Sequence, residues 1–174
     1  MCRIAMNLFS LLFMIPCLMC GEKDHLLHPD IIARCLESPK ISKLEVLIEG
    51  INPYYLHGDF NGDNNPDYAL MVRVGYGKNG VCVCGGDGSI FLLGSAVGSD
   101  KFSDMPDDNF LAPNWLVYTK EDVAGLKDMG GVNAPWPVPV AKGESIAMIW
   151  EDGIALIYWD GKQFKWAGVD PDMQ

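Results

Sequence analysis

The stretch SIAMIWEDGIALIYWDGKQFKW, residues 145–166, carries the clearest signal for the fold of this chain. It divides into three strand-like runs, at 145–150, 154–159 and 163–166. Asp152-Gly153 and Asp160-Gly161 lie between the runs, and aspartate followed by glycine suits the positive φ of tight hairpins. The first two runs are apolar on both faces, as central strands are, whereas the third alternates apolar and polar residues like a half-exposed edge strand.

The rest of the chain extends this pattern towards the N-terminus. Apolar runs predict further short strands at 44–48, 54–57, 68–74, 81–84 and 89–93. Pro29 begins a helical pattern that Ser38-Pro39 ends, and Thr119 with Asp122 has the pattern of a capping box for a second short helix. We therefore expect an α+β fold in which one antiparallel β-meander sheet of about seven strands packs against one or two helices.

The first twenty residues have the pattern of a secretory signal. Arg3 is their only charged residue, and an interrupted apolar core runs from Leu8 to Leu18. This core is too short for a membrane-spanning helix, which needs about 20 apolar residues. We expect residues 1–20 to be a secretory signal, 21–28 a tether and 29–174 a single domain of an exported protein, either periplasmic or at the cell surface.

The end of this signal has two interpretations. Cys20-Gly21 resembles a bacterial lipoprotein junction, which would make Cys20 the site of a lipid anchor. Cys17 and Met19 stand where such a junction prefers leucine and a small residue. Ordinary cleavage nearby is the alternative.

The charge of the chain is strongly acidic. Without residues 1–20, 12 basic residues face 23 acidic ones, a net charge of −11. Such a surface repels nucleic-acid phosphates and anionic membranes, and it attracts cations.

Three cysteines remain beyond the signal and its boundary: Cys35, Cys82 and Cys84. The alternation of Cys82 and Cys84 with valines places both sulfurs on one face of a strand. We expect one disulfide in an oxidising compartment, joining Cys35 to either Cys82 or Cys84. A metal–thiolate site is disfavoured, because no histidine or further cysteine lies at a zinc-like spacing.

The residues most indicative of chemistry form the acidic run DFNGDNNPD, 59–67. Oxygen-bearing side chains occupy alternate positions of this run, at Asp59, Asn61, Asp63, Asn65 and Asp67. Alternate residues of a short loop point inward, and Ca²⁺ takes six to eight oxygen ligands. The spacing therefore predicts a loop that binds Ca²⁺ between two strands. An ordinary solvated turn is the alternative, because it uses the same residue types.

The run, followed by an apolar strand, resembles the calcium loops of FG-GAP and VCBS-type repeats. This resemblance implies side-chain ligation by Asp59, Asn61, Asp63 and Asp67, with a backbone carbonyl from Asn65. The repeats usually have glycine at the sixth position, and Asn64 takes its place here, since asparagine adopts the left-handed region readily. A propeller needs several such blades, whereas this chain has one loop. The whole chain also resembles small exported bacterial proteins, which implies no chemistry.

These observations favour a non-enzymatic, exported binding module of the cell envelope with Ca²⁺ as a structural ion. A protein or glycan partner would contact the long segment 94–118 and the segment around Trp136. Trp115 and Trp136 lie in irregular, proline-flanked segments, where tryptophan either anchors a partner or packs in the core. The alternatives are an inhibitor of a cell-wall hydrolase and a small metal-dependent hydrolase that uses the acidic residues.

Overall fold

A computed structural model describes residues 29–46, 51–74, 78–94, 114–129, 137–151 and 153–168. The first five strands are β1 (Glu45–Val46), β2 (Tyr55–Gly58), β3 (Asp67–Val74), β4 (Lys78–Cys84) and β5 (Ile90–Leu93). The other four are β6 (Asn114–Tyr118), β7 (Ser145–Trp150), β8 (Gly153–Trp159) and β9 (Phe164–Ala167). The helices are α1 (Asp30–Leu36), α2 (Lys120–Gly125) and the 3₁₀ helix η1 (Leu126–Met129).

The strands form two antiparallel sheets. In the first sheet the order is β1-β3-β4-β5, and β2 also pairs with β3. In the second sheet the order is β6-β7-β8-β9. The prediction of antiparallel strands with two short helices is confirmed, but the prediction of one sheet of about seven strands is wrong.

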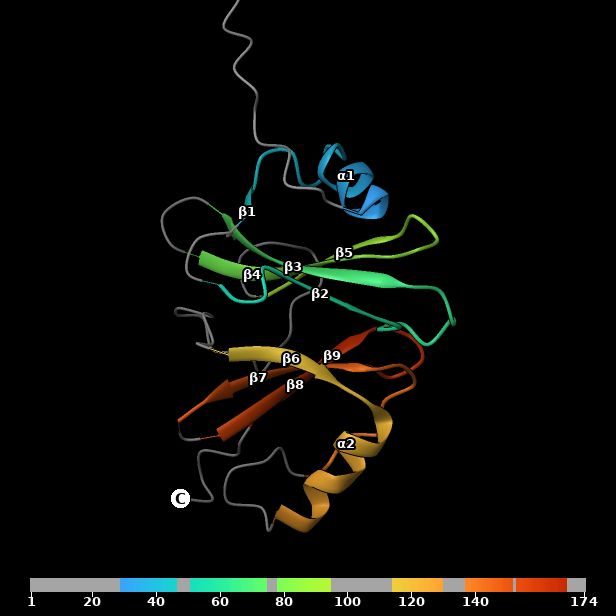
Figure 1. The fold of residues 1–174 in the computed structure, drawn as a ribbon, viewed down its shortest axis with the longest axis vertical. Coiled ribbons are helices and arrows are strands. Elements are labelled where there is room, and N and C mark those ends of the chain that lie inside the picture. The colour runs from blue at the N-terminus through green and yellow to red at the C-terminus, as the bar shows by residue number, and fades with distance from the viewer. Residues whose placement is uncertain are drawn as a thin grey trace, which may run out of the picture.

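The sheets and helices stack in four layers, which Figure 1 shows from top to bottom as α1, the first sheet, the second sheet and α2. The two sheets face each other across the largest core cluster, which includes Met71 of β3, Ile146 of β7 and Ile157 of β8. A second cluster lies between α1 and the outer face of the first sheet. A third lies between α2 and the outer face of the second sheet.

This layering explains why the central strands are apolar on both faces. Ala69 and Met71 of β3 point into the core between the sheets, whereas Leu70 and Val72 point towards α1. Side chains alternate between the two faces of a strand, so both sets are buried. A single sheet covered by helices on both faces would require the same pattern, which is why the pattern did not distinguish one sheet from two.

The second helix begins as the sequence predicted. The Thr119 hydroxyl accepts a hydrogen bond from the backbone N–H of Asp122, and the Asp122 carboxylate accepts one from the N–H of Thr119. This reciprocal capping box lowers the pKa of Asp122 below its ordinary value, because the backbone N–H of Thr119 stabilises the charged form.

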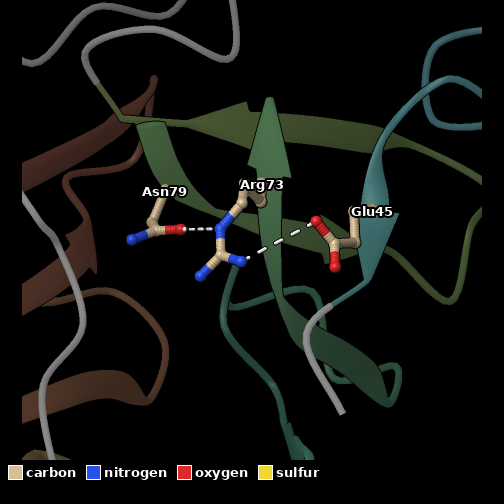
Figure 2. Close-up of polar contacts among 3 residues, drawn as sticks. All are labelled: Glu45, Arg73 and Asn79. Carbon is tan, nitrogen blue, oxygen red and sulfur yellow. Dashed lines mark hydrogen bonds and ion pairs between the residues drawn. The ribbon is translucent and has the colours of Figure 1, made fainter. Parts of the chain in front are cut away.

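A group of three polar side chains lies where the short strand β1 pairs with β3. Figure 2 shows the guanidinium of Arg73 between Asn79 and Glu45. Its Nε–H donates to Asn79 Oδ1 at 3.0 Å, and its Nη1 lies 3.8 Å from Glu45 Oε2. Glu45 is largely exposed, so the ion pair contributes at most about 1 kcal/mol. Of the two interactions of Arg73, the hydrogen bond to the buried Asn79 is stronger than the ion pair with Glu45.

A disulfide joins α1 to the first sheet. It links Cys35 to Cys84 across 49 residues of sequence, and Cys82 is a buried free thiol. Of the two pairings predicted from sequence, the structure thus selects Cys84. Closing a loop of this length restricts the unfolded chain and stabilises the folded one by about 2–4 kcal/mol.

Several predictions from the sequence lie outside the described residues. These are the signal at 1–20 with its lipid anchor at Cys20, the tether at 21–28, most of the segment 94–118, and Trp136. Among the residues that the structure describes, no helix is long and apolar enough to span a membrane.

The burial of Cys82 predicts an unreactive thiol. Desolvation raises the pKa of this thiol to about 12, so the reactive thiolate is scarce at pH 8. We expect iodoacetamide at pH 8 to leave Cys82 unmodified in the folded protein and to alkylate it fully in denaturant without reductant. Peptide mass mapping of the Cys82 peptide checks this, and rapid alkylation of the folded chain would contradict it.

Candidate metal centre

The acidic run forms the connection between β2 and β3. The two strands pair in antiparallel register up to Gly58 and Asp67, so residues 59–66 make a closed loop at one end of the first sheet. Gly62 and Asn64 have positive φ angles of 76° and 65°. The left-handed conformation expected at Asn64 is therefore confirmed, and it turns the backbone at the sixth position of the loop.

Asp59 and Asp67 organise the loop from its two ends. The Asp59 carboxylate accepts hydrogen bonds from the backbone N–H groups of Gly62, Asp63 and Asn64, at 2.8, 3.0 and 3.1 Å. The carboxylate therefore satisfies three donors within the turn that it begins. Aspartate residues that begin turns commonly accept hydrogen bonds in this way from backbone N–H groups a few residues later in the chain.

Asp67 is the buried carboxylate of the set, with none of its surface exposed. One of its oxygens accepts from the N–H groups of Phe60 and Asn61 at 2.9 and 3.2 Å, and the other accepts from Gly86 at 3.0 Å. Burial raises the pKa of Asp67 above its ordinary value, and these hydrogen bonds act in the opposite direction. The bond to Gly86 ties the loop to the turn between β4 and β5.

Asp63 lies on the exposed side of the loop beside Asn61 and Asn65. Its carboxylate accepts from the backbone N–H of Asn65 at 2.7 Å and from the Asn61 amide at 3.2 Å. The backbone bond from Asn65 lowers the pKa of Asp63, so the group is ionised at neutral pH. Both neighbouring asparagines thus lie within hydrogen-bonding distance of this charge.

The loop also contacts the second sheet, which the sequence did not predict. Glu144, directly before β7, accepts a hydrogen bond from the N–H of Asp59 at 2.8 Å and donates its own N–H to the Asp59 carbonyl at 2.7 Å. Phe60 inserts its fully buried ring into the core between the sheets. The acidic loop is therefore a junction between the two sheets rather than a free hairpin.

Gly143 makes this close approach possible. A Cβ atom at this position would collide with the carbonyl oxygen of Asp59 and would lie 2.8 Å from both Gly62 N and Phe60 O. On the facing side, a Cβ on Gly62 would lie 2.8 Å from the carbonyl oxygen of Lys142. Only glycine fits at these two positions without moving backbone.

The donors of the loop fit the chemistry of a hard cation. An ionised carboxylate has about four acceptor positions, so Asp59 and Asp67 each retain one beyond the three N–H groups that they bind. Asp63 is exposed and retains more. Among the described residues, however, the only three acidic, histidine or cysteine ligand atoms within 4.8 Å of one another are sulfurs. The loop carboxylates would have to move closer together to share an ion, and calcium ligation stays a prediction.

The other residues singled out from sequence lie elsewhere. His57 is on β2 with its ring 4.8 Å from that of Tyr68, and it is exposed. Trp115 is on β6, so the prediction that it lies in an irregular segment is wrong. It is 2% exposed, and its Nε1–H donates to the carbonyl of Pro53 at 2.6 Å. Of the two interpretations of Trp115, core packing is confirmed and partner anchoring is wrong, because its ring fills the space between the sheets.

Substitution of Gly143 tests the junction between loop and second sheet. We expect Gly143→Ala to lower the free energy of unfolding by about 1–3 kcal/mol, because the methyl group forces backbone apart. Gly125→Ala is the matched control, since a Cβ there meets nothing within 4 Å and alanine favours its helix. Urea denaturation of both variants gives the comparison. Equal stability of the two would contradict this account of Gly143.

Comparison with known proteins adds no assignment to this geometry. No family model, no curated protein and no solved structure matches the chain.

Proposed function

We propose that the protein is an exported, non-enzymatic module of the bacterial cell envelope, and that its acidic loop binds Ca²⁺ as a structural ion. The observation that carries the proposal is the position of the loop. Through Glu144 the loop is bonded to the second sheet, and through Gly86 it is bonded to the turn between β4 and β5. An ion in this loop would stiffen the junction between the sheets.

The proposed ligands are the side chains of Asp59, Asn61, Asp63 and Asp67, and the backbone carbonyl of Asn65. Ca²⁺ would supply the positive charge that lets several carboxylates lie close together. Bonds to N–H groups already fix the backbone of the loop, so binding would require the carboxylates to move closer together but would need little ordering of the backbone. A structural role is favoured over catalysis, because an ion bound by the oxygens of the loop itself would leave little room for a substrate.

Calcium should raise the melting temperature of the full chain, and a chelator should reverse the rise. A ligand present at 100 times its dissociation constant stabilises a protein by about 2.7 kcal/mol. We expect Asp63→Asn to remove this response, because it keeps the hydrogen-bonding shape of the side chain and removes its charge. Thermal unfolding followed by circular dichroism measures the response.

The matched control is Asp122→Asn, which removes another exposed carboxylate, at the start of α2. This variant should respond to Ca²⁺ as the wild type does. An unchanged melting temperature of the wild type in millimolar Ca²⁺ would remove the proposal. Mg²⁺ should have a smaller effect, because it demands a tighter octahedral geometry.

Export has its own test. The disulfide between Cys35 and Cys84 agrees with an oxidising compartment, where such bonds persist. In a bacterial host that exports proteins, the mature chain should lack its first residues, with a new N-terminus near residue 20. Mass spectrometry of the fractionated cells determines that terminus. A full-length chain confined to the cytoplasm would contradict export.

A further inference from the structure

Three buried sulfurs meet between α1 and the first sheet. Cys35 comes from α1, and Cys82 and Cys84 come from the face of β4 that points towards this helix. Cys82 Sγ lies 3.9 Å from Cys35 Sγ and 3.8 Å from Cys84 Sγ. All three side chains are buried, with at most 4% of their surface exposed.

The position of Cys82 does not suit exchange with the disulfide. A thiolate displaces one sulfur of a disulfide by approaching along the S–S axis, from beyond the sulfur that it attacks. On that axis, Cys82 would lie much nearer to one sulfur than to the other. Its nearly equal distances place it beside the bond instead.

The same distances suit three thiolates that share one ion. Metal–thiolate bonds of about 2.3 Å place two sulfurs on the same ion roughly 3.8–4.0 Å apart, in tetrahedral or trigonal geometry. Cys82 already has this separation from both partners. Once the disulfide is reduced, only Cys35 and Cys84 have to separate to complete the triangle.

We propose that the reduced form of Cys35, Cys82 and Cys84 is a three-thiolate site for one soft monovalent cation, Cu(I), and that the disulfide form excludes this ion. Thiolates select Cu(I) over hard cations. Within the described part of the chain, no fourth histidine, cysteine or carboxylate ligand atom joins the three sulfurs. Zn²⁺ requires four ligands in a structural site, so three sulfurs favour Cu(I).

The reduction that opens the site is balanced by a dithiol. The dithiol gives two electrons and two protons to the disulfide between Cys35 and Cys84, and it leaves as its own disulfide. Cu(I) then displaces the thiol protons as it binds. A cavity of about 90 Å³ is lined by both disulfide cysteines together with Ile31, Arg34 and Gly85, so it reaches two of the three sulfurs.

The experiment measures transfer of Cu(I) to the full chain. Cys2, Cys17 and Cys20 are replaced by serine in every sample, so that only the three buried sulfurs remain. One sample is reduced with dithiothreitol and desalted without oxygen, and the other is kept oxidised. Each is titrated with Cu(I) held by bathocuproine disulfonate, whose absorbance falls as the protein takes the ion.

We expect one Cu(I) per reduced chain and none per oxidised chain. Cys82→Ser should lose the ion at the same competitor concentration while keeping its disulfide when oxidised. Val83→Ala, a buried substitution on the opposite face of β4, should retain it. Circular dichroism of every sample reports the fold.

Three results would overturn the proposal. The first is equal uptake by reduced wild type and Cys82→Ser, because two sulfurs would then suffice. The second is equal uptake by the oxidised chain. The third is uptake only by a chain that has unfolded on reduction, because the site depends on α1 lying over β4.

Discussion

The structure depends on one buried carboxylate, that of Asp67. Its two oxygens accept three backbone N–H groups, from Phe60, Asn61 and Gly86. A buried carboxylate without such partners would cost several kcal/mol, so these bonds are obligatory. They fix the loop after β2 and the turn after β4 relative to each other. With both held, Phe60 enters the core and the N–H of Asp59 meets Glu144, the residue directly before β7 of the second sheet.

Every strand except β6 could be predicted from sequence, whereas β6, which lies in a segment expected to be irregular, and the division of the strands into two sheets could not. The alternation in 145–166 located β7, β8 and β9 to within a residue, because hairpin pairing is local. The first sheet ends at β5 and the second begins with β6, whose Trp115 fills the core between them. The sequence of a strand indicates that both of its faces are buried. It does not indicate which element covers each face, because that element lies far away in the chain.

The same limit applies to the candidate site. The residues of the loop, and the left-handed backbone at Asn64, follow from a local pattern. Glu144 and Gly143 lie about eighty residues further along the chain, in a stretch with no metal-like spacing, so sequence reasoning missed them. A glycine beside a glutamate just before a strand was the available signal. It indicates close backbone approach only once a facing loop is known.

The two candidate sites meet at one short turn. Cys84 ends β4 and is fixed to α1 by the disulfide, and two residues later the N–H of Gly86 binds Asp67. A Cβ on Gly86 would lie 2.7 Å from the carbonyl of Pro66, so the turn and the loop touch directly. Packed backbone in contact transmits small shifts, because it has little free volume. The sulfur cluster on one face of the first sheet therefore lies two residues along the chain from the backbone N–H that binds the acidic loop.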